Sequence, residues 1–165
     1  MALRTILTEQ DPSLHKKCRP VTEFNRRLWD LIDDLKETLA EANGAGLAAP
    51  QVGILRRVVI VVGEDEEMIE LVNPEIIAEE GEQEGFEGCL SVPGKWGVVK
   101  RPAKVRVRAQ DRNGNTFEVE GEGITARCFC HETEHLDGHL FTEHTERLYT
   151  SEELDELLAK EEKKK

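Results

Sequence analysis

The sequence lacks a long apolar run and an excess of positive charge. No stretch reaches the roughly 20 apolar residues that a helix needs to span a bilayer, and no apolar run follows Met1-Ala2-Leu3-Arg4. We therefore expect a cytoplasmic protein that has no membrane partner. The net charge is −12, which argues against a general nucleic-acid binder, so we also expect no DNA partner.

Internal repeats, linkers and a second domain are also absent, so the 165 residues predict one domain over 1–165. Apolar residues make up 38% of the chain and charged residues 34%, which is typical of a soluble globular protein. Four cysteines in a chain that is not secreted indicate thiols or metal ligands rather than disulfides. They are Cys18, Cys89, Cys128 and Cys130.

The first half of the chain predicts one helix followed by extended structure. Apolar residues recur at helical spacing over residues 23–43, which predicts an amphipathic helix that packs on the core and carries no chemistry. Asn43-Gly44 ends this helix, and we expect a loop after it. Residues 57–62 predict a buried strand, the acidic run 64–67 a turn, and residues 69–78 further extended structure around a proline.

The second half predicts a hairpin and two helices. Basic and apolar residues alternate over 104–109, which indicates a half-exposed strand with a solvated basic face, and 111–115 turns it back towards the next strand. Residues 124–137 predict a helix that stops at a glycine. A capping box at 150–153 opens a short last helix, and we expect the charged end of the chain to be frayed.

The segment His131-Glu132-Thr133-Glu134-His135 indicates a hydrolytic metal site. On a helix, residues four apart share a face and lie about 6 Å apart along the axis, so both imidazoles can reach one ion. Glu132 then lies beside the ion, where it can handle a proton. The alternative is an exposed amphipathic helix whose two histidines are only solvated.

Catalytic sites of this kind usually take a third protein ligand. The metzincin pattern is disfavoured, because Phe141 occupies the position of its third histidine. Glu152 and Glu153 are candidates in a highly charged tail, where solvated side chains are the commoner case. Cys128 lies about 10 Å along a helix axis from His135, too far to share an ion with it.

The other cysteines differ in their surroundings. Cys130 points to another side of the helix from His131, and Cys18 lies in a polar stretch with no supporting geometry. Cys89 lies in Glu87-Gly88-Cys89-Leu90-Ser91-Val92-Pro93, where glycine allows close backbone approach and proline ends the segment. A thiolate at Cys89 could close a Cys-His-His site.

The chain resembles the peptide deformylase family of bacterial type through three segments in a fixed order. They are Gly44-Ala45-Gly46-Leu47-Ala48-Ala49-Pro50-Gln51, Glu87-Gly88-Cys89-Leu90-Ser91, and His131-Glu132-Thr133-Glu134-His135-Leu136-Asp137-Gly138. The chain departs from the family where Glu134 replaces an aspartate and Cys130 a glutamine. The resemblance runs to about Thr150. It implies a single-domain α+β fold with antiparallel sheets around a central metal-binding helix, an N-terminal amphipathic helix and a short C-terminal helix.

The resemblance also implies an activity: removal of the N-formyl group from the formyl-methionine of new proteins, with release of formate. One divalent ion is implied on Cys89, His131 and His135, with Fe²⁺ as the physiological ion and Zn²⁺, Ni²⁺ or Co²⁺ as substitutes. Glu132 carries the proton, and Gln51 and the backbone N–H of Leu90 stabilise the oxyanion.

Substrate contacts and partners follow from the same resemblance. Gly46 helps to position the peptide, and helix geometry places Cys128 and Ile124 about one and two turns before the first histidine, where they line the methionine pocket. The partners expected are the N-formylmethionyl peptide and a transient contact with the ribosome. We interpret His15, His139 and His144 as surface histidines.

Two other functions fit part of the pattern. One is a small zinc peptidase with a glutamate ligand, which acts on a free amino terminus. The other is a deformylase-like protein that binds peptide or ribosome without turnover. Glu132, Gln51 and Cys89 together argue against a pure binder, because binding alone requires neither a proton carrier nor an oxyanion donor.

Overall fold

The computed structural model describes residues 2–163 and contains two antiparallel sheets and three α-helices. The elements in chain order are η1 (Pro12–His15), α1 (Arg26–Ala42), β1 (Gly46–Ala48), η2 (Ala49–Val52), β2 (Val58–Val62), β3 (Met68–Glu80), β4 (Gln83–Cys89), β5 (Val92–Arg101), β6 (Lys104–Gln110), β7 (Thr116–Glu122), α2 (Gly123–His135), η3 (Phe141–His144), β8 (Leu148–Thr150) and α3 (Ser151–Lys163).

The larger sheet has the order β1-β2-β3-β6-β7 and is covered by a helix on each face. On β2, Val58 and Ile60 pack with the apolar residues of α1, whereas Val59 and Val61 pack with those of α2. Successive residues of a strand point to opposite faces, so a strand that is covered on both sides is apolar throughout. This explains why β2 reads as an unbroken run of valine and isoleucine.

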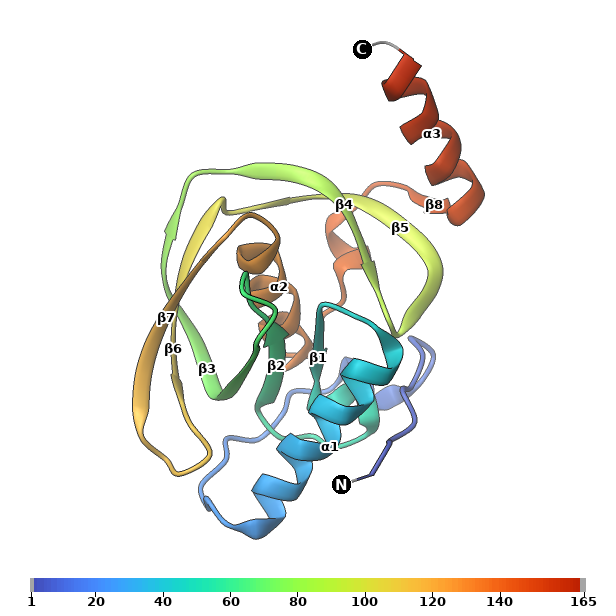
Figure 1. Cartoon of the computed structure of the whole chain (residues 1–165). Helices are drawn as coiled ribbons and strands as arrows, with labels where there is room; N and C mark the ends of the chain where they lie inside the picture. The colour runs from blue at the N-terminus through green and yellow to red at the C-terminus, as the bar shows by residue number, and fades with distance from the viewer. Residues whose placement is uncertain (1, 164–165) are drawn as a thin grey trace.

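The smaller sheet has the order β4-β5-β8 and lies on the other side of α2, as Figure 1 shows. The helix α2 therefore lies between the two sheets, and its residues are mostly buried. This single-domain α+β arrangement around a central helix confirms the predicted fold class. In the described residues no helix is both long enough and apolar enough to cross a membrane.

The predicted amphipathic helix is confirmed as α1, which begins three residues later than expected. Asn25 caps it, with its side chain accepting a hydrogen bond from the Leu28 N–H at 3.3 Å. Asn43 ends it in the left-handed conformation at φ 56°, as the Asn-Gly pair predicts. The predicted strands around 57–62, 69–78 and 104–109 correspond to β2, β3 and β6.

Three local expectations are wrong. The segment after α1 is not a loop, because Gly46 pairs with Val61 in the larger sheet and Ala49–Val52 forms a 3₁₀ turn. Pro93 does not end its segment but lies second in β5, where a proline is tolerated at the start of a strand. The helix α2 ends at His135, before the expected stop at Gly138, which adopts φ 82° in the following turn.

The last helix begins as expected and is longer than expected. The Thr150 hydroxyl accepts from the Glu153 N–H and the Glu153 carboxylate accepts from the Thr150 N–H, both at 3.2 Å, which is the predicted capping box. The helix α3 then continues to Lys163, so residues 161–163 of the expected frayed end belong to this helix. The rest of the expected frayed end, 164–165, lies outside the described residues.

We predict that Leu35→Ala lowers the free energy of unfolding by about 2–5 kcal/mol, because Leu35 is 0% exposed and the truncation leaves a cavity under the larger sheet. The measurement is urea unfolding at fixed metal content. Leu158→Ala is the matched control: Leu158 is 45% exposed on α3, and its loss should change the free energy by less than about 0.5 kcal/mol. Equal effects of the two variants would contradict this account of the core.

Candidate metal centre

The two histidines of α2 point to the same place. His131 and His135 are both buried, and their Nε2 atoms lie 3.2 Å apart. One helical turn separates them, which is the arrangement that the four-residue spacing predicts. The ring of Phe141 from η3 stacks on His131 with centroids 6.0 Å apart, so His131 is packed from the other side as well.

Cys89 reaches the same place from the smaller sheet. It is the last residue of β4 and pairs with Val92 of β5 across a tight turn. Its Sγ lies 3.4 Å from His135 Nε2, and the ligand atoms of Cys89, His131 and His135 all lie within 4.8 Å of one another. In residues 2–163 this is the one group of three or more such side chains that could hold a metal ion.

The other three cysteines lie in the core between the larger sheet and α2. Burial raises the pKa of the Cys128 thiol to about 12 and those of Cys18 and Cys130 to about 11. A thiol with a raised pKa is a poor metal ligand, because the thiolate is the ligand form. Cys130, where the family usually has glutamine, is therefore a small apolar core residue here.

Glu87 orients the first histidine. Its carboxylate lies 2.5 Å from His131 Nδ1 and also accepts hydrogen bonds from Arg101 at 2.7 and 3.1 Å and from Arg127 at 2.8 Å. Burial opposes ionisation of this carboxyl, but His131 and Arg101 overcome that effect and hold its pKa well below its usual range. With Nδ1 bonded to Glu87, the Nε2 of His131 is the nitrogen that faces His135 in the candidate metal group.

Glu134, where the family usually has aspartate, extends this network. Its carboxylate accepts from Arg101 on one oxygen and contacts His144 with the other. His144 is exposed, as are His15, which contacts the Glu9 carbonyl, and His139, which pairs with Glu143. None of the three belongs to the candidate metal group.

Two buried polar atoms of the α2 residues at this site have no hydrogen-bond partner. They are Glu132 Oε1 and His135 Nδ1. Glu132 Oε1 lies 3.9 Å from His135 Nε2, and burial raises the pKa of this carboxyl to about 7 despite the opposing charge of His131. A carboxylate with an unpartnered oxygen next to two imidazoles and a thiol is expected where an ion and its water bind. Two nitrogens and one sulfur suit Zn²⁺ and similar divalent ions, so the donor set fits a metal.

Gly46 passes directly over the Glu132 carboxylate. A Cβ at this position would lie 2.5 Å from Glu132 Oε2, closer than real Cβ atoms approach a neighbour. The short strand β1 thus brings its backbone against the carboxylate, which only glycine permits. The backbone at Gly46 accordingly limits the movement of the Glu132 side chain.

Gln51 is fixed with its amide nitrogen towards the cysteine. Its Oε1 accepts from the Ala48 N–H at 2.9 Å, and its Nε2 donates to Ser91 Oγ at 3.0 Å and lies 3.6 Å from Cys89 Sγ. The Ser91 N–H also points at Cys89 Sγ, at 3.4 Å. Gln51 of the first motif and Ser91 of the second motif therefore both contact the sulfur of Cys89.

These side chains open into a cavity of about 570 Å³. Its walls include Leu90, Cys128 and Ile124 of the predicted substrate site, with Cys128 buried and Ile124 74% exposed. Sequence reasoning missed Glu87 and Arg101. Glu87 could have been noticed as the first residue of the second motif, whereas no sequence signal marked Arg101, because β5 was not predicted.

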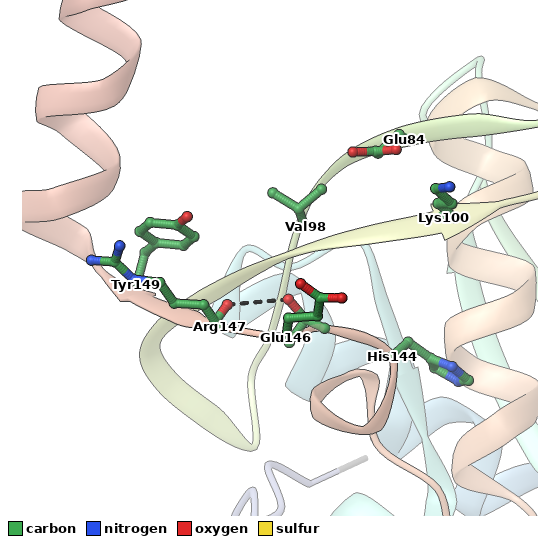
Figure 2. A pocket seen from close by; sticks show the side chains of 8 residues that line it. Glu84, Val98, Lys100, His144, Glu146, Arg147 and Tyr149 are labelled. Atoms are coloured by element: carbon green, nitrogen blue, oxygen red, sulfur yellow. Dashed lines mark hydrogen bonds between the residues drawn. The ribbon is translucent and has the colours of Figure 1, made fainter.

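A separate cavity of about 640 Å³ lies against the strands β4 and β5 and the segment before α3. Figure 2 shows its wall, with Glu84, Val98 and Lys100 on the strands and His144, Glu146, Arg147 and Tyr149 on the segment. It shares no lining residue with the cavity at the histidines and holds no candidate metal group. Glu153, one of the alternative ligands, caps α3 and pairs with Arg147 at 2.6 Å.

Comparison with known proteins gives consistent matches. A family model described as polypeptide deformylase matches residues 3–151. A relative named peptide deformylase from Agathobacter rectalis is 58% identical over 88% of this chain and 92% of that protein. Another of the same name, from Caldicellulosiruptor bescii, is 54% identical over 94% of this chain and 93% of that protein.

Solved structures agree with the sequence matches. A peptide deformylase from Thermotoga maritima superposes with a TM-score of 0.84 at 36% identity over 89% of this chain and all of that one. A peptide deformylase from Legionella pneumophila superposes with a TM-score of 0.83 at 41% identity, over 97% of this chain and 98% of that one. From the family model, the relatives and the shared fold we conclude that this chain belongs to the peptide deformylase family.

Proposed function

We propose that this protein removes the N-formyl group from the N-terminal formyl-methionine of newly made proteins and releases formate. As a member of its family, it is a hydrolase with peptide deformylase activity. The observation that carries the proposal is the convergence of three donor atoms within 4.8 Å, next to a buried and unpartnered Glu132 oxygen. That constellation suits hydrolysis of an amide such as a formylated amine.

Cys89, His131 and His135 would hold one divalent ion, and Fe²⁺ is the ion that we propose. Such an ion lowers the pKa of bound water towards neutrality. The softness of one thiolate and two imidazoles also admits Zn²⁺, Ni²⁺ or Co²⁺ as substitutes. Because a thiolate next to ferrous iron is prone to oxidation, the iron form should be the most sensitive to air.

Glu132 is the proposed proton carrier. Its carboxylate accepts a proton from the attacking water and later returns it to the amine that leaves. A carboxyl whose pKa lies near neutrality suits both transfers, and burial raises that of Glu132 to about 7. The close approach of Gly46 keeps the carboxylate in one orientation for both steps.

Gln51 and the backbone N–H of Leu90 are the proposed donors to the oxyanion that forms at the formyl carbon. The position of the Gln51 amide supports this role, because its carbonyl is already bonded to Ala48 and its NH₂ faces Cys89. An amide donor that is fixed before the reaction does not need to reorganise during it. Gly46, Cys128 and Ile124 of the same cavity are proposed to contact the formyl-methionine.

The proposed setting is the cytoplasm, where new chains emerge from the ribosome. A transient ribosome contact fits this setting, and α3 is the available element because it has no buried residue and projects from the rest of the molecule (Figure 1). The peptidase alternative needs a glutamate ligand at Glu152 or Glu153. Both belong to α3, outside the candidate metal group.

We predict that the metal-loaded protein releases formate from formyl-methionyl peptides, and that Glu132→Gln lowers kcat by about 10² or more while keeping metal and fold. Glutamine has the same shape but cannot carry the proton. Glu156→Gln, on the exposed face of α3, is the matched control and should keep wild-type kcat. The assay measures formate release from the formylated peptide, with an unformylated peptide run in parallel as a control. Cleavage of the unformylated peptide alone would favour the zinc peptidase. Absence of turnover with both peptides would favour the protein that binds peptide without turnover.

We also predict that Cys89→Ala binds its ion at least roughly 10²-fold more weakly than the wild type, because only two of three ligands remain. Cys128→Ala is the matched control, since its thiol is buried one helical turn before His131 and is not in the donor group. Metal content is measured after anaerobic purification and dialysis. Full occupancy in Cys89→Ala would place the third ligand elsewhere and reopen the glutamate-ligated peptidase.

A further inference from the structure

The indole of Trp96 lies against the backbone immediately before the metal-ligand cysteine. A Cβ at Gly88 would lie 2.4 and 2.5 Å from two ring carbons of Trp96, so the ring covers Gly88 and only glycine leaves room for it. Gly88 and Trp96 both line the cavity that contains His131 and Glu132. Trp96 is therefore part of the wall of the proposed active site, although none of the three sequence motifs contains it.

The C-terminal segment holds this ring in place. Trp96 Nε1 donates to Ser151 Oγ at 3.3 Å, and Trp96 pairs with Tyr149 of β8 across the sheet. The Tyr149 ring in turn makes an edge contact with Phe86, with centroids 5.6 Å apart. Phe86 lines the same cavity as Trp96, so two aromatic side chains form one supported surface beside the metal centre.

This aromatic surface is apolar and partly open. Trp96 and Phe86 are only half-buried, which leaves aromatic area facing the cavity. Lys95, which precedes Trp96 on β5, is exposed and also lines this cavity. The charge of Arg127, another lining residue, is met by Glu87 at 2.8 Å. An apolar side chain that entered here would bury aromatic surface, while the Lys95 side chain is exposed and its ammonium group can stay in water.

We propose that Trp96, supported by Phe86, is a specificity-determining residue that binds an apolar side chain of the substrate downstream of the methionine. The inference rests on the proposed function. The occupant is assigned as substrate because the aromatic surface and the proton-carrying Glu132 share one cavity. The protein then favours new chains with a large apolar residue shortly after the formyl-methionine.

The first test compares kcat/KM for formyl-methionyl peptides that carry leucine, phenylalanine, serine or glycine at the second or the third position. The wild type should prefer the apolar residues by roughly 10-fold at one of these positions. In Trp96→Ala the preference should fall below about 2-fold, with kcat/KM for the glycine peptide nearly unchanged, and Trp96→Phe should keep part of it. Trp29→Phe, on the exposed side of α1, is the matched control and should keep the whole preference.

An equal loss for all peptides in Trp96→Ala would mean a structural role and would overturn the proposal, as would an unchanged preference. Absence of formate release by the wild type with every peptide would instead contradict the proposed function itself. The two failures are therefore distinguishable.

The second test uses fluorescence and does not depend on turnover. The chain has two tryptophans, so Trp96 is the only tryptophan left in the Trp29→Phe variant. With Glu132→Gln added to slow turnover, the leucine peptide should change the Trp96 emission in a saturable way and more than the glycine peptide does. Equal emission changes with both peptides, or none at concentrations that saturate binding by calorimetry, would overturn the proposal.

Discussion

The buried Glu87 carboxylate is the interaction on which the geometry of the candidate metal centre depends. It joins β4 to α2 through His131 and Arg127, and to β5 through Arg101. A buried carboxylate is strongly unfavourable unless it is paired and fully hydrogen-bonded, and here three side chains satisfy it. Removal of any of them would take at least one hydrogen bond from this buried carboxylate. The same bonds that stabilise Glu87 also fix the ring orientation of His131, so stability and metal geometry share one set of contacts.

The metal centre joins parts of the chain that are distant in sequence. Cys89 and His135, 46 positions apart, meet where the turn after β4 reaches the end of α2. The larger sheet adds Gly46, which lies close enough to restrain Glu132. At the helix α2, the smaller sheet therefore adds one candidate ligand, Cys89, and the larger sheet adds a restraint on Glu132. This arrangement explains why the site needs the whole fold even though each motif is short.

The sequence predicted those parts that local patterns determine. Helical spacing of leucines indicated α1, the Asn43-Gly44 pair its end, and the capping box at Thr150 the start of α3. The strands β4 and β5 were not predicted, because their glycines and charged residues interrupt the alternation that marks a strand. Arg101 and Trp96 are important only through what they contact across the sheet, and single-sequence patterns carry no such information.

The most direct test of this account is X-ray absorption spectroscopy of the protein loaded with Zn²⁺. The account predicts one sulfur at about 2.3 Å and two imidazole nitrogens at about 2.0–2.1 Å from the metal. In Cys89→Ala the sulfur signal should disappear, and in Cys128→Ala it should remain. A wild-type spectrum with nitrogen and oxygen ligands alone would show that the ion does not bind between Cys89, His131 and His135, and would contradict the central claim.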